Sequence, residues 1–160
     1  MERLINRRQQ GDLGEASAIE WLARKGAIVF LPVGHSPDVD LVADLAGRLC
    51  RIQVKTTTCR RRPPGNERRW VAAICTRGGN QSWQGVSKRL DPEAIDYLFV
   101  LAGDGRRWFI PTRAFDARAG ITLGGHKYAS YEIESTSPID ELVYGPSSLL
   151  DSPTAGGAPE

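Results

Sequence analysis

Apolar residues recur at three- and four-residue steps in the first part of the chain, from Asp12 to about Lys25. This spacing predicts an amphipathic helix that Asp12 caps at its amino end and that Gly26 terminates. The residues expected to face the core are Leu13, Ala16, Ile19, Leu22 and Ala23. Glu15 departs from the pattern, because apolar residues follow it at four and seven positions. Its carboxylate is therefore expected on or beside the buried face.

Three strands are predicted after this helix. A wholly apolar run at 28–31 indicates a buried strand, and residues 39–44 and 48–57 have strand patterns joined by Leu45-Ala46-Gly47, the length of a tight hairpin connection. Residues alternate along 48–57. One face carries Cys50, Ile52 and Val54, and the other carries Arg51, Gln53 and Lys55.

Later segments predict further strands at 69–75 and a second hairpin formed by 95–101 and 107–111. A short helix is expected over 112–118, with Thr112 as its cap. From about residue 145 the chain is rich in Pro, Gly and Ser and cannot bury enough surface to order itself. We therefore expect one folded domain at 1–144 and a disordered acidic tail at 145–160.

Composition fits one soluble domain, since 160 residues suffice for a real core. Three widely spaced cysteines, no apolar amino-terminal segment and no run of membrane-span length favour a cytoplasmic protein with reduced thiols. All 21 Lys and Arg lie within 1–127, so that part has a formal charge of about +8 and the remainder about −6. A basic body fits a polyanionic partner such as nucleic acid, although a solvated basic surface would have the same charge.

Polar residues of the first hairpin fit a site for phosphodiester hydrolysis. That reaction needs a cation at the phosphate, a source of hydroxide and a positive group near the transition state. If Ala46-Gly47 is a two-residue turn, counting back along the hairpin places Asp40 opposite Gln53, and the period of two puts Lys55 on the same face. Carboxylate and amide oxygens bind Mg²⁺, and a lysine supplies positive charge.

An exposed edge hairpin with merely polar outward positions is the competing interpretation. A register slip of one residue would also move Asp40 away from the sheet face of Gln53 and Lys55. Two features oppose this interpretation: the alternate positions of 48–57 are strongly apolar, and the helix with the inward Glu15 precedes the hairpin within the same 45-residue stretch.

At these residues the sequence resembles the PD-(D/E)XK nuclease superfamily, in particular the branch that includes the cyanobacterial group I intron homing endonuclease. The motifs are Gly14-Glu15, Asp38-Val39-Asp40-Leu41-Val42 and Arg51-Ile52-Gln53-Val54-Lys55-Thr56, with two later segments at 95–100 and 108–111. Their order and spacing, over roughly residues 11–115, carry the resemblance.

The resemblance implies an α/β, restriction-endonuclease-like fold with a mixed central β-sheet flanked by helices, and cleavage with Mg²⁺ or, as an alternative ion, Mn²⁺. It implies that Asp40 is the main metal ligand, that Gln53 offers its side-chain oxygen and that Glu15 completes the acidic shell. Lys55 would orient the attacking water and stabilise charge at the phosphate. The chain departs from the superfamily at Gln53, where Asp or Glu is commonest, and a neutral amide should weaken metal binding.

Basic residues that follow the third predicted strand are candidates for contact with DNA phosphates. They are Arg60, Arg61, Arg62, Arg68, Arg69, Arg77, Lys88 and Arg89. A solvated loop is the alternative for this cluster. Trp83 could stack on a base or pack under its own loop. His35 and His126 have no partners at metal-ligand spacing, so no zinc site is expected.

We therefore expect a Mg²⁺-dependent endodeoxyribonuclease that binds DNA and acts as a homo-oligomer, dimer or tetramer, because cutting both strands at one site usually needs two symmetric centres. Two alternatives stay open. One is a structure-selective nuclease resembling a Holliday-junction resolvase, and the other is a DNA-binding module of the same fold that lost catalysis through Gln53. The acidic tail could cover the basic cleft as a mimic of DNA.

Overall fold

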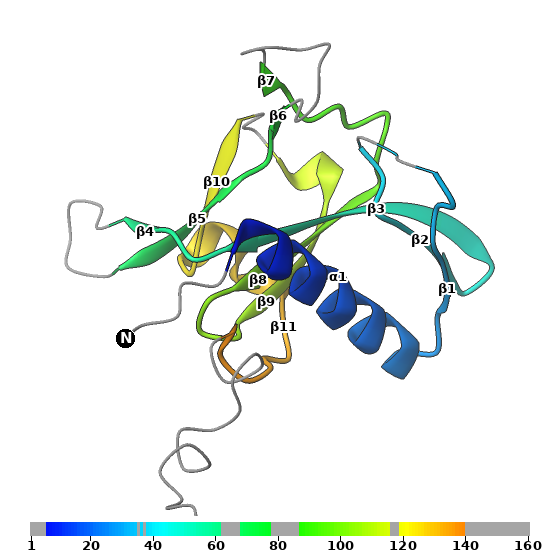
Figure 1. The fold of residues 1–160 in the computed structure, drawn as a ribbon, viewed down its shortest axis with the longest axis horizontal. Coiled ribbons are helices and arrows are strands. Elements are labelled where there is room, and N and C mark those ends of the chain that lie inside the picture. Colours follow the sequence, from blue (N-terminus) through cyan, green and yellow to red (C-terminus); the bar gives the residue numbers. More distant parts are fainter. Residues whose placement is uncertain are drawn as a thin grey trace, which may run out of the picture.

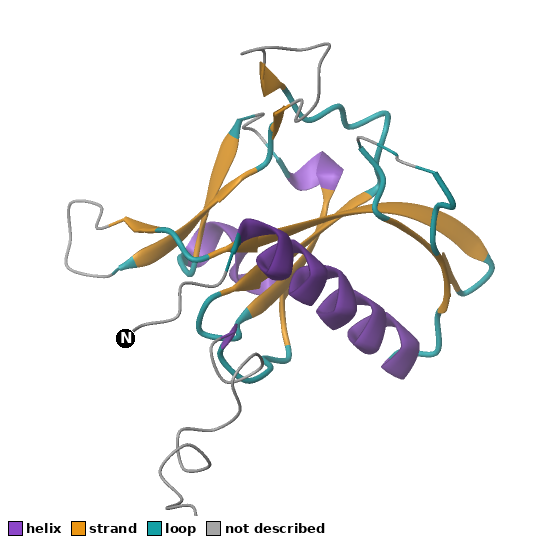
Figure 2. Ribbon diagram, viewed as in Figure 1, coloured by secondary structure: helices purple, strands orange, loops and turns teal. Residues whose placement is uncertain are grey.

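A six-stranded sheet with one long helix on one of its faces forms the centre of the molecule (Figures 1 and 2). The computed structural model describes residues 6–34, 36, 38–61, 68–77, 87–115 and 119–139. The expected tail at 145–160, the loop residues His35 and Trp83, and Arg62 lie outside the described residues. Among the helices of the described part, none has the length and hydropathy of a membrane span.

Helix α1 (Arg7–Arg24) begins six residues earlier than the sequence pattern suggests, so the predicted cap at Asp12 is wrong. The cap is Asn6, whose side chain accepts a hydrogen bond from the Gln9 backbone N–H at 2.9 Å, while Gln9 Oε1 accepts one from the Asn6 N–H at 3.3 Å. This reciprocal pair provides acceptors for two backbone N–H groups at the start of the helix. No apolar residue takes part, so a pattern of apolar positions does not reveal this start. The helix ends where expected, at Lys25 and a left-handed Gly26 with φ of 81°.

The buried face of α1 is also rotated from the predicted one. Its buried residues are Gly14, Ala18, Trp21 and Leu22, whereas Ala16 and Ala23 of the expected stripe are exposed. The reason is the close approach of helix and sheet at Gly14, where a Cβ would overlap Thr56 Oγ1 and lie 3.1 Å from Val54 Cγ1. A residue without a side chain therefore sets the contact face, and a count of apolar positions does not reveal it.

The central sheet has the order β1-β2-β3-β8-β9-β11. Its strands are β1 (Ile28–Phe30), β2 (Leu41–Leu45), β3 (Arg48–Thr57), β8 (Tyr97–Ala102), β9 (Arg107–Pro111) and β11 (Glu132–Ile133). The β3–β8 pair is parallel and the others are antiparallel. Both predicted hairpins, β2–β3 and β8–β9, are confirmed.

Strand β1 differs from its prediction as a buried strand. Ile28 is 62% exposed and Phe30 is 49% exposed, because β1 is the outermost strand and only the intervening Val29 packs into the cluster under α1. An apolar run indicates a strand, but its burial depends on which elements cover it.

The two faces of the central sheet bury separate apolar clusters. Helix α1 covers one face, where Trp21 packs on Phe99 and Phe109. The other face is covered by a three-stranded sheet of order β10-β5-β4, formed by β10 (Gly120–Leu123), β5 (Arg69–Ala73) and β4 (Arg60–Arg61). Strand β5 is the strand expected at 69–75, ending two residues early. Short strands β6 (Thr76–Arg77) and β7 (Ser87–Lys88) pair separately.

The predicted helix at 112–118 is reduced to the 3₁₀ turn η1 (Thr112–Ala114), and residues 116–118 lie outside the described part. Thr112 is not its cap. Its hydroxyl is buried and donates to the carbonyl of Ile95 at 3.0 Å, which ties the turn to the segment before β8. A second 3₁₀ segment, η2 (His126–Tyr131), precedes β11.

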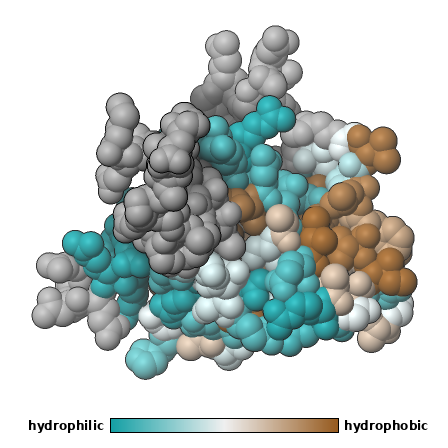
Figure 3. All heavy atoms as spheres, turned by 60° about the horizontal axis from the view of Figure 1, so that its bottom comes forward, coloured by the Kyte–Doolittle hydropathy of each residue, from teal (hydrophilic) through white to brown (hydrophobic). Residues whose placement is uncertain are grey.

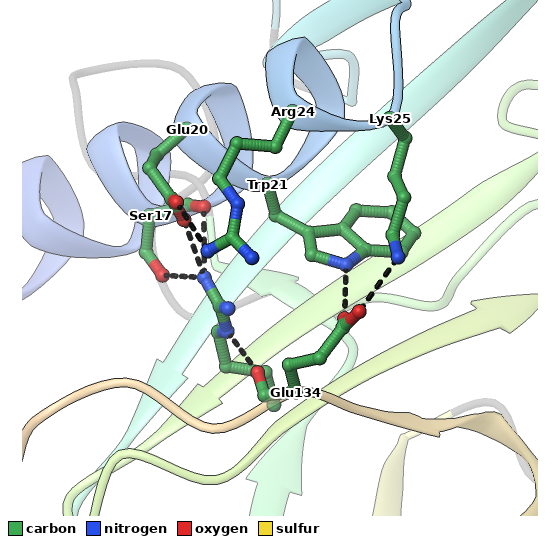
Figure 4. Close-up of polar contacts among 7 residues, drawn as sticks. Ser17, Glu20, Trp21, Arg24, Lys25 and Glu134 are labelled. Atoms are coloured by element: carbon green, nitrogen blue, oxygen red, sulfur yellow. Dashed lines mark hydrogen bonds and ion pairs between the residues drawn. The ribbon is translucent and has the colours of Figure 1, made fainter.

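Polar side chains fasten the carboxyl-terminal half of α1 to the sheet (Figure 4). Arg107 of β9 is 1% exposed and donates to Ser17 Oγ at 3.2 Å and to Glu20 Oε2 at 2.9 Å. Beside it, Glu134 accepts from Trp21 Nε1 at 2.7 Å and from Lys25 Nζ at 2.6 Å. Helix α1 is thus held against the sheet by apolar packing and by charged hydrogen bonds.

Candidate active site

The β2–β3 hairpin has the register that a two-residue turn predicts. Leu45 pairs with Arg48 and Leu41 pairs with Ile52. Both turn residues are left-handed, with φ of 55° at Ala46 and 85° at Gly47, as a type I′ turn requires. Asp44 Oδ1 also accepts from the Gly47 N–H at 2.7 Å.

Continued by one residue, the register places Asp40 opposite Gln53. The Asp40 N–H donates to the carbonyl of Ile52 at 3.0 Å. Its side chain turns back to β3, where Oδ2 accepts from the Val54 N–H at 2.7 Å. The carboxylate therefore takes the place of the backbone carbonyl that a longer β2 would offer to β3, and this hydrogen bond fixes its orientation.

Gln53 and Lys55 lie on an interior strand of the sheet. Gln53 pairs with Leu98 and Lys55 with Val100 on β8, so β3 has neighbours on both sides. Gln53 is 2% exposed and Lys55 is half-buried. The interpretation of a solvated edge hairpin is therefore wrong. Gln53 is thus a buried amide on the strand position opposite Asp40.

Glu15 approaches this group from helix α1. Its side chain is on the surface, yet partial burial of the carboxylate raises its pKa, and the negative charges of Asp40 and Asp12 raise it further. The charge of Asp40 therefore acts on the carboxylate of Glu15 from across the gap between helix and hairpin. Gly14 and Val54 pack together at the same level, so helix packing determines where Glu15 lies.

The structure thus brings Asp40, Gln53 and Lys55 to one face of the sheet and places Glu15 near Asp40. Helix α1 packs on the opposite face, against Val54 and Thr56. Asp40 lies just before β2 begins, where its side chain is hydrogen-bonded to β3 and its charge acts on Glu15 of the helix.

The predicted DNA-contacting residues differ in their surroundings. Arg60 lies 3.9 Å above the Trp70 ring, and its guanidinium is 3.4 Å from Asp104 Oδ2. Arg61, Arg68 and Arg89 are exposed. Arg69 is partly buried beside Gly125. Of Arg77 and Lys88 the structure describes the backbone, which forms the β6–β7 pair, and Arg62 lies outside the described residues.

The sequence patterns placed two exposed arginines outside α1, because they put the start of the helix too late. Arg7 and Arg8 form its first turn. Arg8 precedes Glu15 by seven residues, two helical turns or about 10 Å along the same side of the helix. The capping pair of Asn6 and Gln9 was the signal that could have located them.

Comparison with solved structures supports the expected fold. The chain is similar to a bacterial homing endonuclease, I-Ssp6803I, with a TM-score of 0.57 and 20% sequence identity over 81% of this chain and 88% of that chain. At this identity the likeness shows the fold, which is restriction-endonuclease-like with a mixed central sheet, as predicted.

Comparison with protein families identifies the chain more specifically. Among the curated proteins, none matches the chain. The family model described as PD-(D/E)XK endonuclease matches residues 5–121, which include α1, the β2–β3 hairpin and the β8–β9 hairpin. The chain therefore belongs to the PD-(D/E)XK endonuclease family.

Proposed function

We propose that the protein is an endodeoxyribonuclease that hydrolyses DNA phosphodiester bonds with a divalent metal ion, preferably Mg²⁺. Membership of a nuclease family supports the reaction class. The observation that carries the assignment to particular residues is the hairpin register, which sets Asp40 opposite Gln53 with Lys55 on the same face.

The donor atoms available here fit a hard cation. The described residues contain no group of three or more His, Cys, Asp or Glu that could hold a metal, so the proposal relies on two carboxylates and an amide. Asp40 and Glu15 supply carboxylate oxygens, and the Gln53 amide adds a third hard oxygen, as Mg²⁺ and Mn²⁺ prefer. When bound, the ion neutralises charge on the phosphate and activates water.

Each residue of the chain has a distinct part in this proposal. Asp40, oriented by the Val54 N–H, is the main ligand. Gln53 presents its amide from a buried position that holds it in place. Lys55 supplies a positive charge that orients the attacking water and stabilises the charge that develops on the phosphate. The pKa of Glu15 is raised by burial and by Asp40, so a cation beside this carboxylate would favour its charged form.

DNA contacts are proposed for the exposed basic side chains near the second sheet. Arg61, Arg68 and Arg89 are exposed, and Arg60 is presented by its stacking on Trp70. A stacked guanidinium retains outward-facing donors that suit a phosphate. Arg62, Arg69, Arg77 and Lys88 complete the proposed set. Three free cysteines fit a reducing compartment, and we propose the cytoplasm.

Cleavage of supercoiled plasmid and of a synthetic four-way junction tests the proposal, with Mg²⁺ or with EDTA. Lys55→Met should lose cutting by about 10²-fold or more, because the transition state loses its positive charge. Lys127→Met, at an exposed position of η2, is the matched control and should cut like the wild type.

The results also separate the alternatives. Preference for the junction over the plasmid would favour a structure-selective nuclease. Salt-sensitive DNA binding without cutting in Mg²⁺ or Mn²⁺ would contradict the enzyme and support a binding module in which Gln53 has removed one ligand charge.

A further inference from the structure

An apolar surface lies at the β1 edge of the central sheet. Five large apolar side chains there are about half to fully exposed: Ile28, Phe30, Leu31, Val33 and Leu49. We call these five residues the β1 patch. Hydrophobic surface gathers on the right-hand side of Figure 3, the side on which β1 and the β2–β3 hairpin lie in Figure 1. At about 100 Å² for each fully exposed side chain, the patch amounts to on the order of 300 Å², the lower end of the range for the largest apolar patch on a typical monomer.

The patch borders an open sheet edge. Strand β1 is first in the sheet order, so it pairs with β2 on one side and with no second strand in the described part of the chain. Soluble proteins usually guard such edges with charged residues, since the unpaired N–H and C=O groups can pair with another chain. Residues 27–33 contain no charged residue.

We propose that this edge binds the same edge of a second copy of the chain, forming a two-fold dimer through antiparallel β1 strands. The short strand is self-complementary. In a register centred on Val29, Ile28 of each copy faces Phe30 of the other on one side of the sheet, which is an apolar cross-strand pair. A two-fold interface requires this kind of match between a surface and itself.

The β1 patch would be the centre of a larger interface with a second copy. A standard interface buries about 800 Å² on each partner, with an apolar centre and a polar rim. The β1 patch supplies the centre. Arg48 at the hairpin turn supplies a charged residue for the rim, and Asp44 lies within the patch, between Ile28 and Leu49 in the strand pairing.

The dimer would place two proposed active sites on one side of a continuous sheet. Pairing puts Ile28 beside Asp44 and Phe30 beside Val42, so these residues share the sheet face of Asp40. A two-fold axis between antiparallel edge strands is perpendicular to the sheet, so this face points the same way in both copies. Three strand spacings of about 4.8 Å and six residues of about 3.4 Å separate the two Asp40 positions by about 25 Å. This distance is shorter than one turn of B-DNA, about 34–36 Å. Both centres could therefore act on one duplex; only this last step rests on the proposed function.

Sedimentation of the full chain without DNA or metal tests the interface. We expect the wild type to be a dimer or a higher even oligomer, and Phe30→Lys and Leu31→Lys each to halve its mass or reduce it further. Both positions are exposed, so folding should persist, as circular dichroism can confirm. Thr122→Lys adds the same charge to β10, an edge strand of the other sheet, and should leave the mass unchanged.

A monomeric wild type at high micromolar concentration would overturn the proposal, as would two lysine variants that keep the wild-type mass. A plasmid assay adds a second readout. If the dimer brings two centres to one duplex, the wild type should linearise plasmid while Phe30→Lys accumulates nicked circles at a similar nicking rate. If the wild type dimerises through this edge but cuts nothing, the interface stands and the proposed nuclease function fails.

Discussion

The carboxylate of Asp40 accepts a hydrogen bond from the backbone N–H of Val54 at 2.7 Å, on the strand that carries Gln53 and Lys55. The hydrogen bond has two effects. It ends the β2–β3 ladder with a side chain in place of a backbone carbonyl, and it fixes one oxygen of the proposed metal ligand. The Asp40 side chain therefore contributes both to stability and to the proposed catalysis, and two substitutions can separate these two contributions.

Asp40→Asn should keep the hydrogen bond to Val54, because an amide oxygen can accept it, while the ligand charge is lost. We expect cleavage to fall about 10²–10³-fold with the free energy of unfolding within about 1 kcal/mol of the wild type. Asp40→Ala should reduce cleavage and should also lower the free energy of unfolding by about 1–3 kcal/mol, because it leaves the Val54 N–H without an acceptor. Urea denaturation and plasmid cleavage measure the two effects, and equal stability of the two variants would contradict this role of the hydrogen bond.

Gln53→Glu restores the acid that is commonest in the superfamily. At a position that is 2% exposed, a further carboxylate opposite Asp40 should destabilise the metal-free protein by about 1–3 kcal/mol through burial and repulsion. Mg²⁺ should offset this cost, so the Tm gained on adding Mg²⁺ should exceed that of the wild type by about 5 °C. Thermal denaturation across a Mg²⁺ titration gives the result. An equal gain in both proteins would argue against Gln53 as a ligand.

Gly14→Ala should destabilise the protein by about 1–3 kcal/mol although alanine favours helix. The new Cβ would overlap Thr56 Oγ1 and crowd Val54, so α1 must move away from β3 and carry Glu15 with it. Cleavage should fall along with stability. Chemical denaturation and the plasmid assay measure both.

Gly11→Ala is the matched control on the same helix, since nothing lies within 4 Å of its added Cβ. This change should stabilise the protein by about 0.5–1 kcal/mol. Adding Thr56→Ala to Gly14→Ala should recover part of the loss. If both glycine variants behave alike, close packing at Gly14 is not what positions the helix.

Glu134 makes stability depend on pH in the acid range. Its hydrogen bonds from Lys25, its own backbone and Trp21 lower its pKa from 4.5 to about 2. The unfolded chain therefore takes up this proton first as pH falls. The contribution is present above pH 4.5 and is lost progressively toward pH 2. Glu134→Gln should lower Tm at pH 7 and flatten the decline of Tm between these values. Glu93→Gln, at an exposed position before β8, should keep the wild-type profile.

The hairpin could be predicted from sequence because its determinants are local. A two-residue turn at Ala46-Gly47 fixes the register, and the alternation along 48–57 fixes which side chains share a face. The positions of Asp40, Gln53 and Lys55 relative to one another follow from these facts alone. The resemblance to a nuclease superfamily followed from the same residues and is confirmed by the family match.

Features set by distant parts of the chain were missed or mistaken. The apolar run of β1 lies at an edge and is not buried, and this depends on the position of the other strands. The second sheet joins 120–123 to 70–73, a pairing about fifty residues apart that no local pattern shows. The helix face was misplaced because its closest contact is at Gly14, which has no side chain to count.

The parallel pairing of β3 with β8 has a consequence during synthesis. All four proposed catalytic residues are made by position 55, yet the strand that supports β3 on its inner side begins about forty residues later, at Tyr97. Because chains emerge from the amino end, a nascent chain carries the complete set of chemical groups well before it has the sheet that holds them. Cleaving ability should therefore arise only after β8 has been made, which would spare nucleic acid near the ribosome from a half-made nuclease.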